Sequence, residues 1–350
     1  MGPENQFAGS NSSDKSDLKI AKTVHDLFKF AQQAEQLFRQ QMTTDGAIFQ
    51  RAIKRYETDL PPWPKGFPVP AWFRGQSLRG EGLIPKCRRK LYGYPAWQEN
   101  HVLSVFMLGA HARTAEQLPA KDDYAGWLAV AQHHGLPTRL LDWSGSVLVA
   151  AFFATQDRSP EEDGIIYSVS PSLVNAEFGE HTGPSQLMLE YHDPNVQICD
   201  QRFSLLTKSE RDKAVDYTKQ CLKDRTLTQK EANRLWPVLK QAEMTELVAG
   251  AFGASVPQNT KTLAVGPRQT TRRIMQQLGF FTIHGGGSIS LENAPYHNDF
   301  LLEITIPAAE KKNIRNQLRL LGITRSQLFP DLDNLATEIA DDFTSNSNSP

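Results

Sequence analysis

Apolar residues near the start of the chain recur at the spacing of a helix with one apolar face. They are Ile20, Val24, Leu27, Phe28, Ala31, Ala34, Leu37 and Phe38. This period predicts an amphipathic helix over residues 20–42, which we expect to pack on the main domain rather than on a foreign partner. A further helix is predicted over 94–113, with Val102, Val105, Phe106 and Leu108 on the side that faces the core. Helices are also predicted over 122–134, 144–155, 311–321 and 332–343, and around Arg273.

Short apolar stretches between turn residues predict strands near residues 71–75, 164–170, 263–265, 280–284 and 300–306. Strands and helices mixed in this order are typical of an α+β domain. We therefore expect a compact, mostly antiparallel sheet covered by helices.

The pattern also predicts the organisation of the chain. Residues 1–18 are rich in Ser, Asn, Asp and Gly and are expected to be disordered, as is the tail 344–350. Residues 19–66 form a helical segment and a proline-rich connector, and 67–343 form the main domain. Within that domain, residues 175–260 are predicted to be a charged helical insertion, with helices over 207–224 and 228–247. The insertion is either a solvated face, or a lid or macromolecule-docking module over the site.

Composition excludes only a few classes of protein. Of 350 residues, 39% are hydrophobic and 22% charged, and the formal net charge is -1. No global field therefore attracts nucleic acid or an anionic membrane. The three cysteines are scattered, the N-terminus does not resemble a signal peptide, and no apolar run approaches the ~20 residues that span a bilayer. These features predict a cytoplasmic protein.

The stretch Ala131–Ser144, with the sequence AQHHGLPTRLLDWS, combines charged and large apolar residues. Polar groups among apolar neighbours must be paired, so we expect a buried polar cluster here. Asp142 should be ionised and paired with Arg139 or His134. The cluster is either the wall of a site or a structural network with an ion pair between Arg139 and Asp142.

The predicted strand over 71–75 carries a second unusual group. Trp72 and Arg74 should lie on one face of this strand, and Phe73 and Gly75 on the other. A glycine at this position indicates close approach by a ligand or by another strand.

No familiar nucleotide-binding, hydrolase or zinc motif is present in the sequence. His133 and His134 are adjacent in a predicted helix and diverge by ~100°, so they cannot both face one metal. The remaining candidates are Arg74, Arg139 and Arg273, because guanidinium groups bind phosphate through paired hydrogen bonds. Trp72, Trp143 or Phe281 could stack on a ring of such a ligand.

The chain resembles the FRG-domain family, which is named for a Phe-Arg-Gly motif. The resemblance rests on Phe73-Arg74-Gly75, on the stretch Ala131–Ser144, on the Arg273–Thr282 element and on the ending from Ile304 to Leu332. It spans about residues 68–336. A weaker resemblance links the chain to ADP-ribosyltransferases of the arginine–serine–glutamate type, which open with an aromatic-Arg-Gly strand and imply an antiparallel sheet of that kind.

The second resemblance implies specific roles. Arg74 would hold the pyrophosphate of NAD, and Thr138, Asp142 or Ser144 would lie beside the nicotinamide. The third element would be Glu303, in the strand over 300–306, or Gln277. Neither a Ser-Thr-Ser strand nor a Glu-x-Glu motif is present, so Asp142 and Glu303 are equal candidates for the catalytic carboxylate. The expected catalytic residues are Arg74, Asp142 and Glu303. The expected NAD-binding residues are Arg74, Gly75, Gln76, His134, Thr138, Arg139, Trp143, Arg273 and Gln277.

Three hypotheses about function follow. The first is an NAD-dependent ADP-ribosyltransferase that modifies a macromolecule, nucleic acid or protein, as a toxin or a phage-defence effector would. The second is a nucleotide- or nucleic-acid-binding module without enzymatic activity, which uses an arginine-lined pocket. The third is a purely structural core in which Arg139, Asp142 and His134 satisfy one another.

Overall fold

The computed structural model describes residues 19–56, 69–80, 82–89, 93, 98–114, 118–120, 123–156, 160–178, 251, 260–266 and 271–347. Its strands are β1 (Trp72–Gln76), β2 (Leu140–Ser144), β3 (Gly164–Val169), β4 (Thr262–Val265), β5 (Gly279–His284) and β6 (Leu301–Ile306). Its helices are α1 (Val24–Gln41), α2 (Ala47–Tyr56), α3 (Glu99–Ala110), α4 (Tyr124–His133), α5 (Val147–Ala154), α6 (Pro171–Phe178), α10 (Arg272–Gln276), α11 (Lys311–Leu320), α12 (Arg325–Leu328) and α13 (Leu332–Ser347). Short 3-10 turns are η1 (Lys86–Arg88), η3 (Leu291–Asn293), η4 (His297–Asp299) and η5 (Ala308–Glu310).

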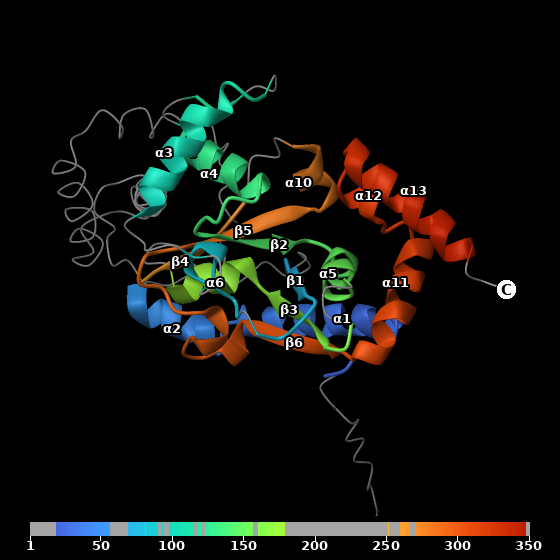
Figure 1. Ribbon diagram of the computed structural model, residues 1–350. Helices are drawn as coiled ribbons and strands as arrows, with labels where there is room; N and C mark the ends of the chain where they lie inside the picture. The colour runs from blue at the N-terminus through green and yellow to red at the C-terminus, as the bar shows by residue number, and fades with distance from the viewer. Residues whose placement is uncertain are drawn as a thin grey trace, which may run out of the picture.

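The strands form one sheet in the order β4-β5-β2-β1-β3-β6, and every neighbouring pair is antiparallel. This arrangement confirms the predicted α+β class with an antiparallel sheet. Figure 1 shows α3 and α4 towards one end of the molecule and α11, α12 and α13 towards the other. The central strand β2 was not predicted, because a strand carrying Asp142 looked unlike a core strand. Asp142 occupies its one exposed position.

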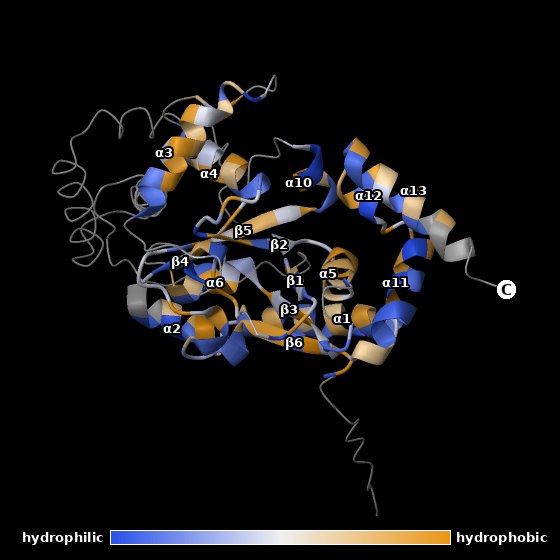
Figure 2. Ribbon diagram, viewed as in Figure 1, coloured by the Kyte–Doolittle hydropathy of each residue, from blue (hydrophilic) through white to orange (hydrophobic). Residues whose placement is uncertain are grey.

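Each face of the sheet has its own apolar cluster. On one face, Trp72, Trp143 and Tyr167 pack with α6 and the second half of α1. On the other face, Phe73 and Ile166 pack with α5, α11 and the first half of α1. Helix α5 is hydrophobic on all sides, as its burial requires (Figure 2). The predicted division of the β1 side chains between the two faces is therefore confirmed.

Gly75 allows α5 to approach β1 closely. A Cβ atom built on Gly75 would lie 1.7 Å from the backbone carbonyl oxygen of Ala150 in α5. Close approach was predicted correctly, but the approaching group is a helix and not a ligand or another strand. Gly75 is therefore a packing residue on the side of β1 that α5 covers.

Both edges of the sheet are covered. Along β6, Ile20 forms a parallel bridge with Thr305, and the chain then enters α1 through the capping box of Thr23 and Asp26. Along β4, the side-chain amide of Asn175 in α6 donates to the carbonyl of Ala264 (3.2 Å) and accepts from its N–H (2.6 Å). This amide occupies the position that another strand would take, and it protects β4 from pairing with a foreign chain.

Helix α1 confirms the predicted amphipathic helix and its packing on the main domain, although Phe30 is buried and Phe28 is exposed. The predicted inner side of α3 is wrong in part: Phe106 packs against the core cluster that contains the buried Leu103, whereas Val105 and Leu108 are exposed. Helix α13 continues to Ser347, so most of the tail expected to be disordered is helical. The predicted helices over 207–224 and 228–247 lie outside the described residues. No helix in the described ranges is both long and apolar enough to cross a membrane.

Candidate functional site

Arg74 lies where β1 and β2 separate. The two strands pair at Phe73 and Ser144, and a continued ladder would place Gly75 opposite Asp142. Instead, Nη1 of Arg74 donates a 2.8 Å hydrogen bond to the backbone carbonyl of Asp142. The Arg74 side chain is 15% exposed. A strand position thus presents a fixed guanidinium group that solvent can still reach.

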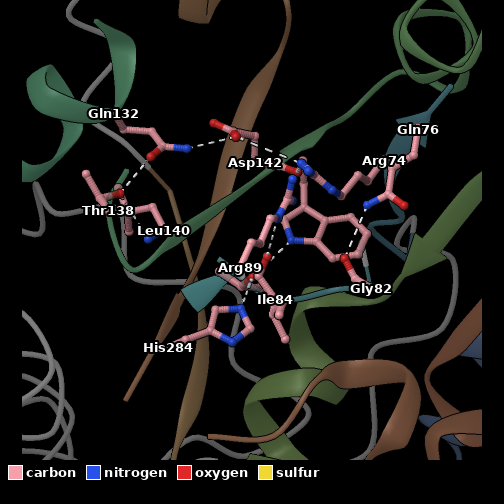
Figure 3. Close-up of polar contacts among 12 residues, drawn as sticks. Arg74, Gln76, Gly82, Ile84, Arg89, Gln132, Thr138, Leu140, Asp142 and His284 are labelled. Atoms are coloured by element: carbon pink, nitrogen blue, oxygen red, sulfur yellow. Dashed lines mark hydrogen bonds and ion pairs between the residues drawn. The ribbon is translucent and has the colours of Figure 1, made fainter. Parts of the chain in front are cut away.

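Asp142 provides a carboxylate beside this guanidinium. Its Oδ2 lies 3.9 Å from Nη1 of Arg74 and accepts a 2.8 Å hydrogen bond from Nε2 of Gln132. Thr138 donates in turn to Oε1 of Gln132 at 2.6 Å. Figure 3 shows the resulting chain from Thr138 through Gln132 and Asp142 to Arg74. The predicted partners of Asp142, Arg139 and His134, are wrong: the cation beside it is Arg74, and its side chain is 57% exposed rather than buried.

Arg139 is withdrawn from the site. It is 2% exposed, and its guanidinium makes an ion pair of 2.6 Å with Glu99 at the start of α3. The predicted ion pair with Asp142 is therefore wrong. Because Glu99 engages both Nε and Nη2, Arg139 anchors α3 to the start of β2 and is not placed to bind a ligand.

A small pocket opens beside Asp142, between the end of α4, α10 and the strands β2 and β5. Its volume is about 50 Å³. The pocket is lined by Gln132, His133, Asp142, Trp143, Arg273, Ile274, Gln277, Gly279, Phe280 and Phe281. A space of this size admits a single small group, such as one phosphate or carboxylate, whereas a whole small-molecule ligand needs several hundred Å³.

Arg273 is the cation of this pocket. Its Nη1 donates to the backbone carbonyl of His133 at 3.1 Å, and its guanidinium lies 4.6 Å from the centre of the Phe329 ring. Burial lowers the pKa of Arg273, although Asp142 and Asp331 oppose that shift. Gln277 turns its amide away, since Nε2 donates to the carbonyl of Leu328.

A buried chain of hydrogen bonds lies on the face of the sheet opposite the Asp142 side chain. Trp143 Nε1 donates to Thr282 Oγ1 (3.0 Å), which lies 2.9 Å from Nε2 of His284. Burial, with help from the charges of Arg88 and Arg74, holds the pKa of His284 well below its usual value. A neutral His284 can accept a hydrogen bond from the Thr282 hydroxyl, so this chain fixes the indole of Trp143.

The comparisons with known proteins bear on this arrangement. Residues 70–163 match the FRG-domain family. The chain contains an FRG domain. No curated protein and no solved structure matches the chain. The matched residues of the FRG domain include Arg74, Gln132, Arg139 and Asp142, whereas Arg273 and Glu303 lie beyond them.

Glu303 lies apart from the polar centre of the FRG domain. It pairs across β6 and β3 with Tyr167, which pairs in turn with Arg74 on β1. Two strand spacings therefore separate it from Arg74, on the side away from Asp142. Its carboxylate is half exposed and forms a 2.9 Å ion pair with Arg79. The two candidate carboxylates thus flank Arg74, and Asp142 is the one beside it.

The remaining predicted site residues are buried, engaged in contacts within the fold, or turned away from the site. Gln76 donates to the carbonyl of Gly82, Thr138 is completely buried, and His134 ends α4 in an exposed position. Trp72 is buried and stacks on Phe280 at 4.6 Å, so its ring is not open to a ligand. Trp143 and Phe281 line the pocket but are also buried, so neither ring offers a broad stacking face to a ligand.

Sequence reasoning missed two residues of this network. Gln132, which donates to Asp142, lies within the stretch Ala131–Ser144, where its polar side chain among apolar neighbours was a usable signal. Glu99, the partner of Arg139, is 40 positions away in the sequence and gave no local signal. Among the described residues, no group of three or more His, Cys, Asp or Glu side chains could hold a metal ion.

Proposed function

We propose that the chain is an NAD-dependent ADP-ribosyltransferase, in which Arg74 binds the pyrophosphate of NAD and Asp142 is the catalytic carboxylate. The proposal rests on one observation: a fixed, partly exposed guanidinium and an exposed carboxylate lie 3.9 Å apart at the centre of the sheet of an FRG domain. Its acceptor is a macromolecule, nucleic acid or protein, and an effector of this kind would act as a toxin or in phage defence.

Arg74 suits the role of phosphate ligand. A guanidinium stays charged when partly buried and offers parallel N–H donors to phosphate oxygens. The hydrogen bond to the carbonyl of Asp142 sets the plane of this group before NAD arrives. Binding a phosphate therefore costs little ordering of the side chain.

Asp142 suits the role of the carboxylate better than Glu303 does. Cleavage of the bond between nicotinamide and ribose builds positive charge on the ribose, which a nearby carboxylate stabilises. Gln132 and Arg74 orient Asp142. Glu303 lies beyond Tyr167 and is engaged by Arg79. Asp142 can also deprotonate the acceptor nucleophile.

The size of the pocket favours a second candidate function. A volume of about 50 Å³ accommodates one anionic group rather than a dinucleotide. Under this alternative the domain binds a nucleotide or nucleic acid through a single phosphate that Arg273 holds in this pocket, and it catalyses nothing.

The decisive experiment measures nicotinamide release and transfer of labelled ADP-ribose to RNA, DNA and protein. We expect activity in the wild type and a loss of about 100-fold or more in both Arg74→Ala and Asp142→Asn. Because the Asp142 side chain is mostly exposed, Asp142→Asn should lower the free energy of unfolding by less than about 1 kcal/mol.

Glu303→Gln is the matched control, since it removes the other exposed carboxylate that flanks Arg74. We expect it to keep full activity. Loss of activity in Glu303→Gln with retention in Asp142→Asn would exchange the two roles. Binding of ADP-ribose without any release of nicotinamide would replace the transferase by the binding module.

A further inference from the structure

Helix α13 carries an apolar stripe that the rest of the described protein does not cover. Leu332, Leu335, Ile339 and Phe343 are 80%, 42%, 50% and 76% exposed. Their spacing of three and four residues places them within about 80° of one another around the helix. Isolated apolar residues on a surface are ordinary, but four aligned on one helix mark an interaction surface.

Helix α13 is held in place by contacts that do not involve the apolar stripe. The carboxylate of Glu338 accepts a 2.6 Å hydrogen bond from the N–H of Ser326 in α12. Asp331 accepts from the N–H of Asn334 and so caps the first turn. Glu338 lies about 100° around the helix from the middle of the stripe. The contact with α12 therefore fixes α13 along one side of the stripe and leaves Leu332, Ile339 and Phe343 at least half exposed.

The charges along this part of the chain have one sign. Asp331, Asp333, Glu338, Asp341 and Asp342 are acidic, and no Lys, Arg or His occurs from Ser326 to Pro350. Figure 2 shows hydrophobic and hydrophilic residues alternating along α13. Glu338 and Asp333 lie about 100° and 120° from the middle of the stripe on its two sides, whereas Asp341 lies on the far side of the helix. An apolar stripe on an acidic helix complements an apolar surface with basic margins.

We propose that α13 is a docking helix for another protein, which contributes an amphipathic helix with lysines and arginines beside its apolar face. Two apolar helix faces would pack along their length, and the basic margins would meet the acidic residues of α13. A second copy of α13 would bring like charges together. An anionic membrane surface would repel the helix for the same reason.

The test uses the full chain and two labelled peptides as long as α13. Both peptides have leucines at helical spacing; one has lysine at all other positions and one has glutamate. Fluorescence anisotropy should show binding of the leucine–lysine peptide, weakened by high salt, and no binding of the leucine–glutamate peptide.

A double variant, Leu335→Ser with Ile339→Ser, should weaken binding of the leucine–lysine peptide at least about tenfold. Its circular dichroism and thermal midpoint should match the wild type, because both side chains are largely exposed. Thr337→Ser, on the other side of α13, is the matched control and should bind normally.

Three results would overturn the proposal. The first is equal binding of both peptides, and the second is unchanged binding of the leucine–lysine peptide to the double variant. The third is a dimer in light scattering that the double variant dissociates, which would make a second copy the occupant.

Discussion

Arg139 illustrates how a charged residue is kept inside this protein. Both members of its pair with Glu99 are almost completely buried. Two charges removed from water stabilise the fold only weakly as a pair, but either one left alone is costly. The pair therefore makes the contact between α3 and the start of β2 specific.

Arg139→Ala should lower the free energy of unfolding by about 3–5 kcal/mol, because Glu99 would remain buried without its cation. Urea unfolding followed by circular dichroism measures this. Arg79→Ala breaks an exposed ion pair with Glu303 and should cost less than about 1 kcal/mol. Similar losses in the two variants would show that burial of the Arg139 pair is not what matters.

His284 should make stability depend on pH. Burial and the charges of Arg88 and Arg74 lower its pKa in the folded state, whereas the unfolded chain titrates near 6.5. Between these two values the unfolded state binds the extra proton. Stability is therefore complete above pH 6.5 and is lost as the pH falls below it, by up to about 1.4 kcal/mol per pH unit.

Urea unfolding of the wild type and of His284→Gln, measured from neutral pH downwards, isolates this contribution. The slope of stability against pH should be shallower in the variant below pH 6.5. Parallel slopes would mean that His284 is accessible to protons in the folded protein.

At the scale of elements, Gly75 determines how closely β1 and α5 pack. Gly75→Ala should destabilise the protein by about 3 kcal/mol or more, because the new methyl group meets backbone atoms of α5 that cannot move aside. Gly279→Ala in β5 is the matched control: its Cβ would meet Ile274 at 3.4 Å, an ordinary contact. Thermal unfolding compares the two, and an equally stable Gly75→Ala variant would refute the tight packing.

Short apolar stretches between turn residues predicted the strands over 164–170 and 300–306, because most of their side chains face a core on at least one side. The strand β2 escaped prediction because Asp142 interrupts its apolar sequence, and its neighbours Arg74 and Gln132 explain a carboxylate there. Likewise, Arg74 and Asp142 were both expected in the site, but their pairing was not. That contact depends on two strands separating after one shared register position, and no spacing in the sequence encodes it.

At the scale of the whole molecule, the residues that match the FRG family supply only β1 and β2 of the sheet. β3 flanks β1 and β5 flanks β2, and both come from later in the chain. The position of Arg74 beside Asp142 therefore depends on strands outside the matched residues. This explains why the later strands could be predicted individually while their order around the site could not.

The bonds between Asn175 and Ala264 have a consequence for how such chains diversify. They join helix α6 to strand β4. The sheet therefore holds both ends of the segment that connects these two elements. The entropic cost of closing a segment grows by only about 0.6 kcal/mol for each doubling of its length. A change in the length of this segment should therefore cost the fold little, provided that Ala251 keeps its place in the core, where it is completely buried in one cluster with Leu103 and Leu128. Between these fixed points the chain can lengthen or shorten without shifting the register of β4.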